Sequence, residues 1–121
     1  MSDDLLLTEA RSRTVPGVPG RSLNTVRTHH FVIDEPASNG GPGEEVTPAE
    51  AFLSGVSGCA VLLLDAFARK EGVPLREARA HIQGVRRKDD PANFREVRLR
   101  LELYGVDDRQ AAALVEKFKG R

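Results

Sequence analysis

The sequence has little cysteine and no excess charge of either sign. Its 121 residues include one cysteine, Cys59, and 18 basic residues balance 18 acidic ones. A single cysteine excludes an intrachain disulfide framework and a thiolate-rich zinc site, so Cys59 is either a packed core thiol or a reactive one. The balanced charge provides no overall field that would attract a nucleic acid or an anionic membrane, and we expect neither as a partner.

Long apolar runs are also absent. The longest run, Ala60 to Leu64, is far too short to cross a bilayer, and acidic residues stand where a secretory signal peptide would have its positive charges. We therefore expect a cytoplasmic protein. The length and the 40% apolar content predict a single domain, residues 1–121, whose small core would gain from dimerisation.

The patterns along the chain predict an α+β domain. Residues up to about Glu35 are expected to form strands around a turn at residues 15–20, with Leu5 and Leu7 in the first of them. Residues 34–47 are rich in proline and glycine and predict a long surface loop. Alternating apolar residues predict two further antiparallel strands, at 78–85 and 97–103, with a bulge at Gly84.

Two helices complete the predicted fold. Thr47, Pro48 and Glu50 have the spacing of a capping box with proline in the first helical position. The apolar residues that follow cover every side, which is typical of a buried central helix, and this helix is expected to end at Gly72. Asp107 predicts the cap of a C-terminal helix with one apolar face.

The residues around Cys59 indicate whether it is a packed core thiol or a reactive one. A lone cysteine beside an apolar helix is more often a small core residue. Two glycines and two serines among residues 54–58, however, predict a break, with a second helix starting near Ser57. Cys59 would then lie in a first turn, where unpaired backbone N–H groups favour the thiolate. In an unbroken helix Glu50 and Cys59 would face opposite sides and could not share a site.

A reactive thiolate also needs a cation close to the sulfur. Any single arginine is more often a solvated surface residue than a site residue. Glu50 has two possible roles, one in the capping box and one in a site, where it would hold a basic partner rather than touch the sulfur. The candidate cations upstream of Cys59 are Arg21 and Arg27 and, as weaker candidates, Arg11 and Arg13.

No metal site is expected from the histidines. His29 and His30 are neighbours on a predicted strand, so their side chains face opposite ways, and His81 lies in a later strand. The basic run at residues 85–88 is interleaved with acidic residues and has few aromatic neighbours. It is therefore interpreted as a solvated sheet face rather than a nucleic-acid-binding surface.

Four motifs, in this order and spacing, resemble the OsmC/Ohr family (osmotically inducible protein C and organic hydroperoxide resistance proteins). They are Phe-Val-Ile-Asp-Glu-Pro at 31–36, Gly-Gly-Pro-Gly at 40–43, Thr-Pro-Ala-Glu-Ala-Phe-Leu at 47–53 and Ser-Gly-Cys at 57–59. The similarity continues through nearly the whole chain. It implies an α+β subunit in an intertwined homodimer, with two active sites at the subunit interface and a reactive cysteine at a helix N-terminus.

The resemblance also implies an activity and the residues for it. Cys59 would attack an organic hydroperoxide and become a sulfenic acid, as in a thiol-dependent peroxidase of oxidative stress defence. Arg27, with Arg21 as the alternative, and Glu50 would organise the site. In the best-studied Ohr branch the acidic residue directly follows the proline, where this sequence has Ala49, so Glu50 matches only the other branch.

The resolving thiol is a second departure from the family. Members of the family have a second cysteine, usually in Cys-Pro, on a helix beyond the position of Arg121, and the sequence contains none. We therefore expect an external thiol reductant and no other cofactor. The alternative interpretation is a non-catalytic dimeric module that binds a small apolar ligand, with Cys59 merely buried.

Overall fold

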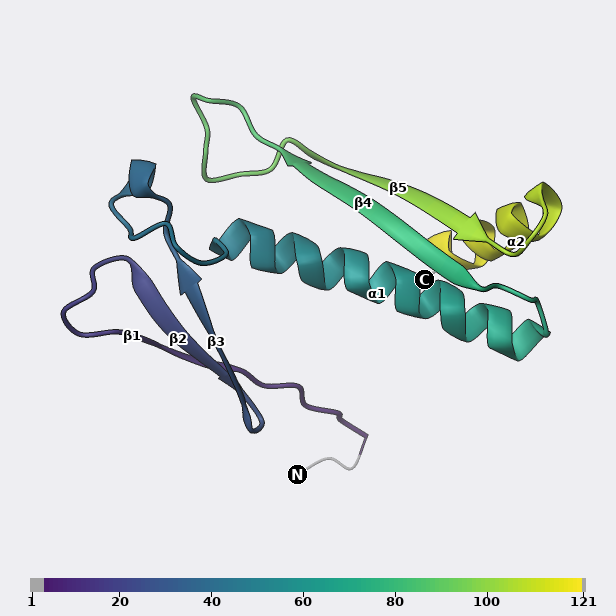
Figure 1. Cartoon of the computed structure of the whole chain (residues 1–121), viewed down its shortest axis with the longest axis horizontal. Helices are drawn as coiled ribbons and strands as arrows, with labels where there is room; N and C mark the ends of the chain where they lie inside the picture. The colour runs from purple at the N-terminus through teal and green to yellow at the C-terminus, as the bar shows by residue number, and fades with distance from the viewer. Residues whose placement is uncertain (1–3, 121) are drawn as a thin grey trace. The chain divides into compact units, whose positions relative to one another are not determined.

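The chain has an α+β fold in two compact units, Met1–Ala51 and Phe52–Arg121 (Figure 1). The computed structural model describes residues 4–120. Strands come first, followed by a long helix, a strand pair and a second helix, which is the predicted order.

The first unit is an antiparallel meander. Strand β1 (Arg11–Thr14) pairs with β2 (Arg21–Val26), and β2 pairs with β3 (His29–Asp34). The predicted meander is confirmed, but the placement of Leu5 and Leu7 in its first strand is wrong. Residues 5–10 have no regular structure, and both leucines are exposed. The reason is pairing: β2 ends at Val26, so residues before Ala10 have no strand opposite them.

A polar cluster holds the loop that follows β3. The side chain of Asp34 is fully buried and accepts hydrogen bonds from Arg21 and from the backbone N–H groups of Glu44 and Glu45. The loop itself contains one short 3-10 helix, η1 (Ala37–Asn39). Among the described residues of this unit no apolar side chain is fully buried, so polar contacts take the place of an apolar core.

Helix α1 (Pro48–Glu71) begins and ends where predicted. The N–H of Thr47 donates to Oε1 of Glu50 over 2.8 Å, and the N–H of Glu50 donates to Oγ1 of Thr47 over 3.2 Å, which makes the expected capping box. Gly72 follows the helix with a φ of 68°, a conformation that favours glycine. The helix is not buried on every side within one chain. Its fully buried residues form one row: Ala60, Leu64 and Ala68.

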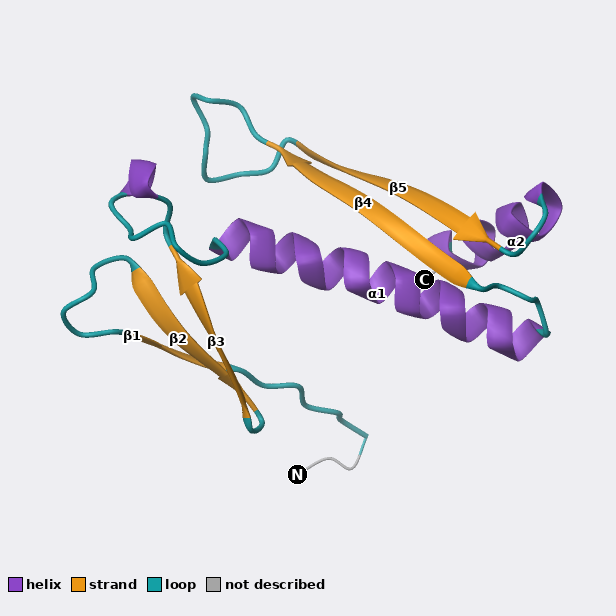
Figure 2. Cartoon of the chain, viewed as in Figure 1, coloured by secondary structure: helices purple, strands orange, loops and turns teal. Residues whose placement is uncertain are grey.

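The second unit packs this buried row against a strand pair and a helix (Figure 2). Strands β4 (Glu77–Val85) and β5 (Glu96–Tyr104) run antiparallel, and α2 (Asp108–Lys119) follows, with Asp107 and Gln110 forming a second capping box. The core centres on Leu64, Ala68 and Leu114. The partly buried residues packed around it are Phe67, Val73, Leu75, Ala78, Leu101, Leu103 and Phe118.

The predicted bulge at Gly84 is wrong. β4 and β5 pair one to one along their whole length, and Gly84 lies opposite Val97 in this register. Glycine is needed here for a different reason, because a Cβ on Gly84 would lie 2.4 Å from Cε1 of Phe94. The glycine therefore makes room for an aromatic ring rather than an extra residue.

Candidate functional site

Cys59 is a free, exposed thiol near the midpoint of α1. The predicted helix break near Ser57 is wrong, because α1 runs unbroken from Pro48 to Glu71. Glycine in a helix interior costs only about 1 kcal/mol, which the packing of a long helix can offset. The Ser57 hydroxyl donates to the carbonyl of Ser54 over 3.2 Å, as helical serines do, instead of capping a new helix. Cys59 therefore lies within the helix and not in a first turn.

The exposed residues around Cys59 form one continuous apolar face. At 100° per residue they all lie within about 60° of Cys59 around the helix axis. We call this face the α1 stripe: Phe52, Gly55, Val56, Cys59, Leu62 and Ala66. No charged residue occurs between Glu50 and Asp65, so the thiol is surrounded along its own helix by apolar and small residues. The sequence alone does not single out this face, because the other sides of the helix are apolar as well.

An aromatic pair lies at the N-terminal end of the α1 stripe. The rings of Phe52 and Phe94 stack with centroids 6.3 Å apart, and the guanidinium of Arg86 lies 5.5 Å from the centroid of the Phe94 ring. Phe52 remains 60% exposed despite this contact. The sequence analysis did not identify Phe94, whose position depends on the space above Gly84. The stripe thus ends in an exposed aromatic surface suited to an apolar or aromatic group.

Glu50 and Cys59 lie on opposite sides of α1. Nine residues separate them, which is two and a half turns, and at 1.5 Å per residue they are about 13.5 Å apart along the axis. Glu50 is engaged in the capping box with Thr47. Within one chain α1 therefore does not bring these two predicted site residues together.

Arg21 is fully engaged in the first unit. Its Nε and Nη2 atoms each donate to a different oxygen of the buried Asp34 carboxylate over 2.8 Å, and Nη2 also donates to Glu44 over 3.0 Å. The hydrogen bonds from Arg21, together with those from the amides of Glu44 and Glu45, lower the pKa of Asp34 to about 2. The same pairing raises the pKa of Arg21. This geometry gives Arg21 a structural role that the sequence did not indicate.

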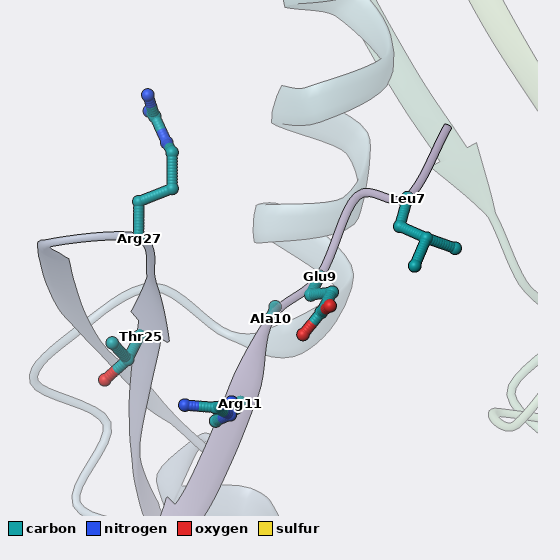
Figure 3. A pocket seen from close by; sticks show the side chains of 6 residues that line it. All are labelled: Leu7, Glu9, Ala10, Arg11, Thr25 and Arg27. Carbon is teal, nitrogen blue, oxygen red and sulfur yellow. The ribbon is translucent and has the colours of Figure 1, made fainter. Parts of the chain in front are cut away.

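Arg27 lies in the two-residue turn between β2 and β3 rather than on a strand. Its φ is 55°, the only positive φ of a non-glycine residue in the described chain. Its side chain lines a pocket of the first unit, shown in Figure 3. In the part of the chain that the structure describes, Arg27 makes no ion pair.

The histidines lie as predicted on strands β3 and β4. Nδ1 of His30 is 2.9 Å from the hydroxyl of Thr25, its cross-strand neighbour. Among residues 4–120 no group of three or more His, Cys, Asp or Glu side chains is placed to hold a metal ion.

By length and composition, α1 is also the one helix in the described residues that is apolar enough to cross a membrane. The uninterrupted apolar run from Ala60 to Leu64 is too short to indicate this. The core helices of soluble proteins meet the same criteria, so the result describes how apolar α1 is. Only 17% of its most apolar segment is buried within the single chain.

The fold and the thiol define a class of small α+β proteins with one exposed cysteine on a long apolar helix. A family model described as "OsmC-like protein" matches residues 41–121, and the chain belongs to this family. No curated protein sequence matches it.

Solved structures agree on the fold. An OsmC-like protein from Mycoplasma pneumoniae superposes with a TM-score of 0.80 at 14% identity, covering 96% of this chain and 82% of its own. An organic hydroperoxide resistance protein OsmC from Legionella pneumophila superposes with a TM-score of 0.69 at 21% identity, covering 96% and 84%. A putative osmotic stress induced and detoxification response protein from Psychrobacter arcticus gives 0.77 at 18% identity, covering 97% and 85%.

Proposed function

We propose that the protein is a thiol-dependent peroxidase that reduces organic hydroperoxides in the cytoplasm, as part of oxidative stress defence. The observation that supports it most is the exposed thiol of Cys59 at the centre of the uncharged α1 stripe. Membership of the OsmC-like family adds to it, since relatives of similar fold from Legionella pneumophila and Bacillus subtilis are named organic hydroperoxide resistance proteins. An apolar surface around the thiol suits the organic part of such a substrate.

The proposed reaction begins with the thiolate of Cys59. The sulfur attacks the terminal oxygen of the hydroperoxide, and an S–O bond forms as the O–O bond breaks. The leaving alkoxide takes a proton and departs as an alcohol. The peroxide is thereby reduced by two electrons, and Cys59 is oxidised to a sulfenic acid.

Recycling of Cys59 requires thiols from outside these 121 residues, which contain no second cysteine. One external thiol condenses with the sulfenic acid, releasing water and leaving a mixed disulfide. A second thiol attacks this disulfide, restores the Cys59 thiol and leaves as the oxidised reductant. The scheme uses an external thiol reductant and no bound cofactor.

Arg27 is our first choice for the cation that holds the thiolate, because Arg21 is already paired with Asp34 and Glu44. Arg27→Gln should lower the rate of peroxide reduction about tenfold or more. Arg109→Gln, which removes an exposed arginine of α2, is the matched control and should retain the rate. If Arg27→Gln reduces peroxide as fast as the control variant, Arg21 becomes the candidate for the cation that holds the thiolate.

A homodimer is part of the proposal. The α1 stripe is a contiguous exposed apolar face, and such faces often mark contacts between proteins. A second copy placed on it would bury the stripe and bring other side chains to Cys59, including the Glu50 that α1 holds away from it in one chain. This agrees with the intertwined homodimer that the family resemblance implies.

The deciding experiment is to treat the protein with one equivalent of cumene hydroperoxide and to trap the sulfenic acid with dimedone. The adduct should map to Cys59 by mass spectrometry, and the thiol should be alkylated rapidly at neutral pH in the folded protein. Cys59→Ser should form no adduct, and Ser57→Ala should react like the wild type. A folded protein whose Cys59 resists both reagents would contradict the proposal.

A second candidate function is a non-catalytic dimeric module that binds a small apolar ligand. The unbroken α1 favours it, because Cys59 gains nothing from a helix N-terminus. An apolar fluorescent probe should then bind the wild type and Cys59→Ser equally, while neither protein consumes hydroperoxide. Consumption by the wild type alone would exclude this candidate.

A further inference from the structure

The first unit contains a pocket whose chemistry the proposed peroxidase reaction does not explain. Its volume is about 340 Å³, within the size range of small-molecule sites. Figure 3 shows its side chains, which come from the segment before β1, from the start of β1 and from the end of β2 and the turn after it. The lining residues are Leu7, Glu9, Ala10, Arg11, Thr25 and Arg27.

The strand register places two of the lining residues side by side. Arg11 and Thr25 are direct cross-strand partners in the β1–β2 ladder. Glu9 comes from the irregular segment just before β1, and Arg27 from the turn just after β2, so both lie beside this cross-strand pair. Thr25 is held in place by its contact with Nδ1 of His30 at 2.9 Å. Arg11 and Thr25 are thus held on paired backbone.

Both arginines of the pocket lack an acidic partner among the described residues, as do several other arginines of the chain. Arg21, Arg69, Arg79, Arg87, Arg98 and Arg100 all form ion pairs. Arg11 and Arg27 form none within the described residues, and Glu9 pairs with neither of them within 4.0 Å. Two guanidinium groups in one pocket therefore keep their hydrogen-bond donors available for an external acceptor.

The backbone at Arg27 adds an independent observation. A two-residue hairpin turn with positive φ at its first residue normally has glycine there. Arg27 occupies this position with a φ of 55°, which costs conformational energy that glycine would avoid. This strained backbone conformation places the charged side chain of Arg27 at the pocket.

We propose that this pocket binds a small monocarboxylate with an apolar body. Arg11 and Arg27 would hold the carboxylate, and Leu7 and Ala10 would contact the apolar part. Two positive charges and one negative charge leave a net charge of +1, which matches a single carboxylate. Inorganic phosphate has no apolar body to contact Leu7 and Ala10, and its second negative charge exceeds the single net positive charge of the pocket. The inference shares Arg27 with the proposed function, where this arginine holds the Cys59 thiolate, but hexanoate binding tests it separately, because binding can fail while peroxide reduction remains, and the reverse.

The test is a titration of the ¹⁵N-labelled protein with sodium hexanoate, followed by amide chemical shifts at constant pH. Hexanoate should shift the amides of Arg11, Thr25 and Thr28 saturably, and hexan-1-ol and inorganic phosphate should shift them far less. Arg11→Gln and Arg27→Asn should each weaken binding at least about fivefold. Asparagine tolerates a positive φ, so the second variant retains the turn.

Two further variants separate charge recognition from general disturbance. Glu9→Gln should tighten hexanoate binding about two- to fivefold, because it removes the repelling charge. Arg13→Gln, which changes an exposed arginine of β1 outside the pocket, should bind like the wild type. Equal affinity for hexan-1-ol, tighter binding of phosphate, or wild-type affinity in both pocket arginine variants would each overturn the proposal.

Discussion

The buried carboxylate of Asp34 makes the stability of the first unit depend on pH. Hydrogen bonds from Arg21, then from the amides of Glu44 and Glu45, lower its pKa from 3.8 to about 2. Because the folded-state value lies below the ordinary one, the pairing adds stability that is complete above about pH 4 and is lost as the pH falls towards 2. Asp34→Asn should therefore lower the melting temperature by several degrees at neutral pH, and the difference should narrow in acid. A difference that stays constant over this range would contradict the assignment.

Glu50 has a capping role that is visible in the structure and a site role that is proposed, and two substitutions separate them. Glutamine can also close a capping box, whereas alanine cannot. Glu50→Gln should therefore retain the melting temperature and lose peroxide reduction if the carboxylate acts at the site. Glu50→Ala should lose both, with a stability cost of about 1 kcal/mol. Thermal unfolding and peroxide consumption on both variants give the answer. An active Glu50→Gln variant would leave Glu50 with the capping role alone.

Among the elements, those specified by local chemistry could be predicted from the sequence. Both helices begin at capping boxes because a side chain three residues away satisfies the free N–H groups. The predicted break near Ser57 was wrong, because the low helix propensity of glycine and serine costs less free energy than the packing of a whole helix provides. The predicted strand at Leu5 was wrong, because the alternation of apolar and polar residues does not reveal where the partner strand ends. The bulge at Gly84 was wrong because the need for glycine arises from Phe94, ten residues away.

The unbroken α1 makes a testable prediction at Gly58. This glycine lies inside the helix, and a Cβ built on it would meet nothing within 4 Å in the single chain. Gly58→Ala should therefore stabilise the protein by up to about 1 kcal/mol, because alanine is the better helix former. Chemical denaturation measures the change. A loss of stability that grows with protein concentration would instead show that another chain approaches the helix at this point.

At the scale of the whole molecule, the order of the elements and the family could be predicted, but the candidate site could be predicted only in part. Cys59 was identified because it is the only cysteine. The pairing of Arg21 with Asp34 could not be predicted, because the two residues lie on different strands and become neighbours only through the strand register. The α1 stripe was hidden in a helix that is apolar on all sides, where the sequence does not distinguish the face covered by β4 and β5 from the face left exposed.

The exposed face of α1 gives the last prediction, which concerns assembly. Leu62 is 67% exposed in the single chain, so Leu62→Glu should cost a monomer little. In the proposed homodimer the same change would place a charge in an apolar interface and drive the subunits apart. Gln83→Glu is the control, because it adds the same charge at an exposed residue of β4 whose side chain faces away from the core.

Sedimentation over a range of concentrations should show wild type and Gln83→Glu as dimers and Leu62→Glu as a monomer. Peroxide reduction should fall with the dimer if the second copy completes the site around Cys59. A Leu62→Glu protein that remains a dimer would mean that the subunits meet elsewhere and that the stripe is open to substrate. A Leu62→Glu monomer with full activity would mean that each chain contains a complete site, and Arg27 and Glu50 would then have no role that depends on a second copy.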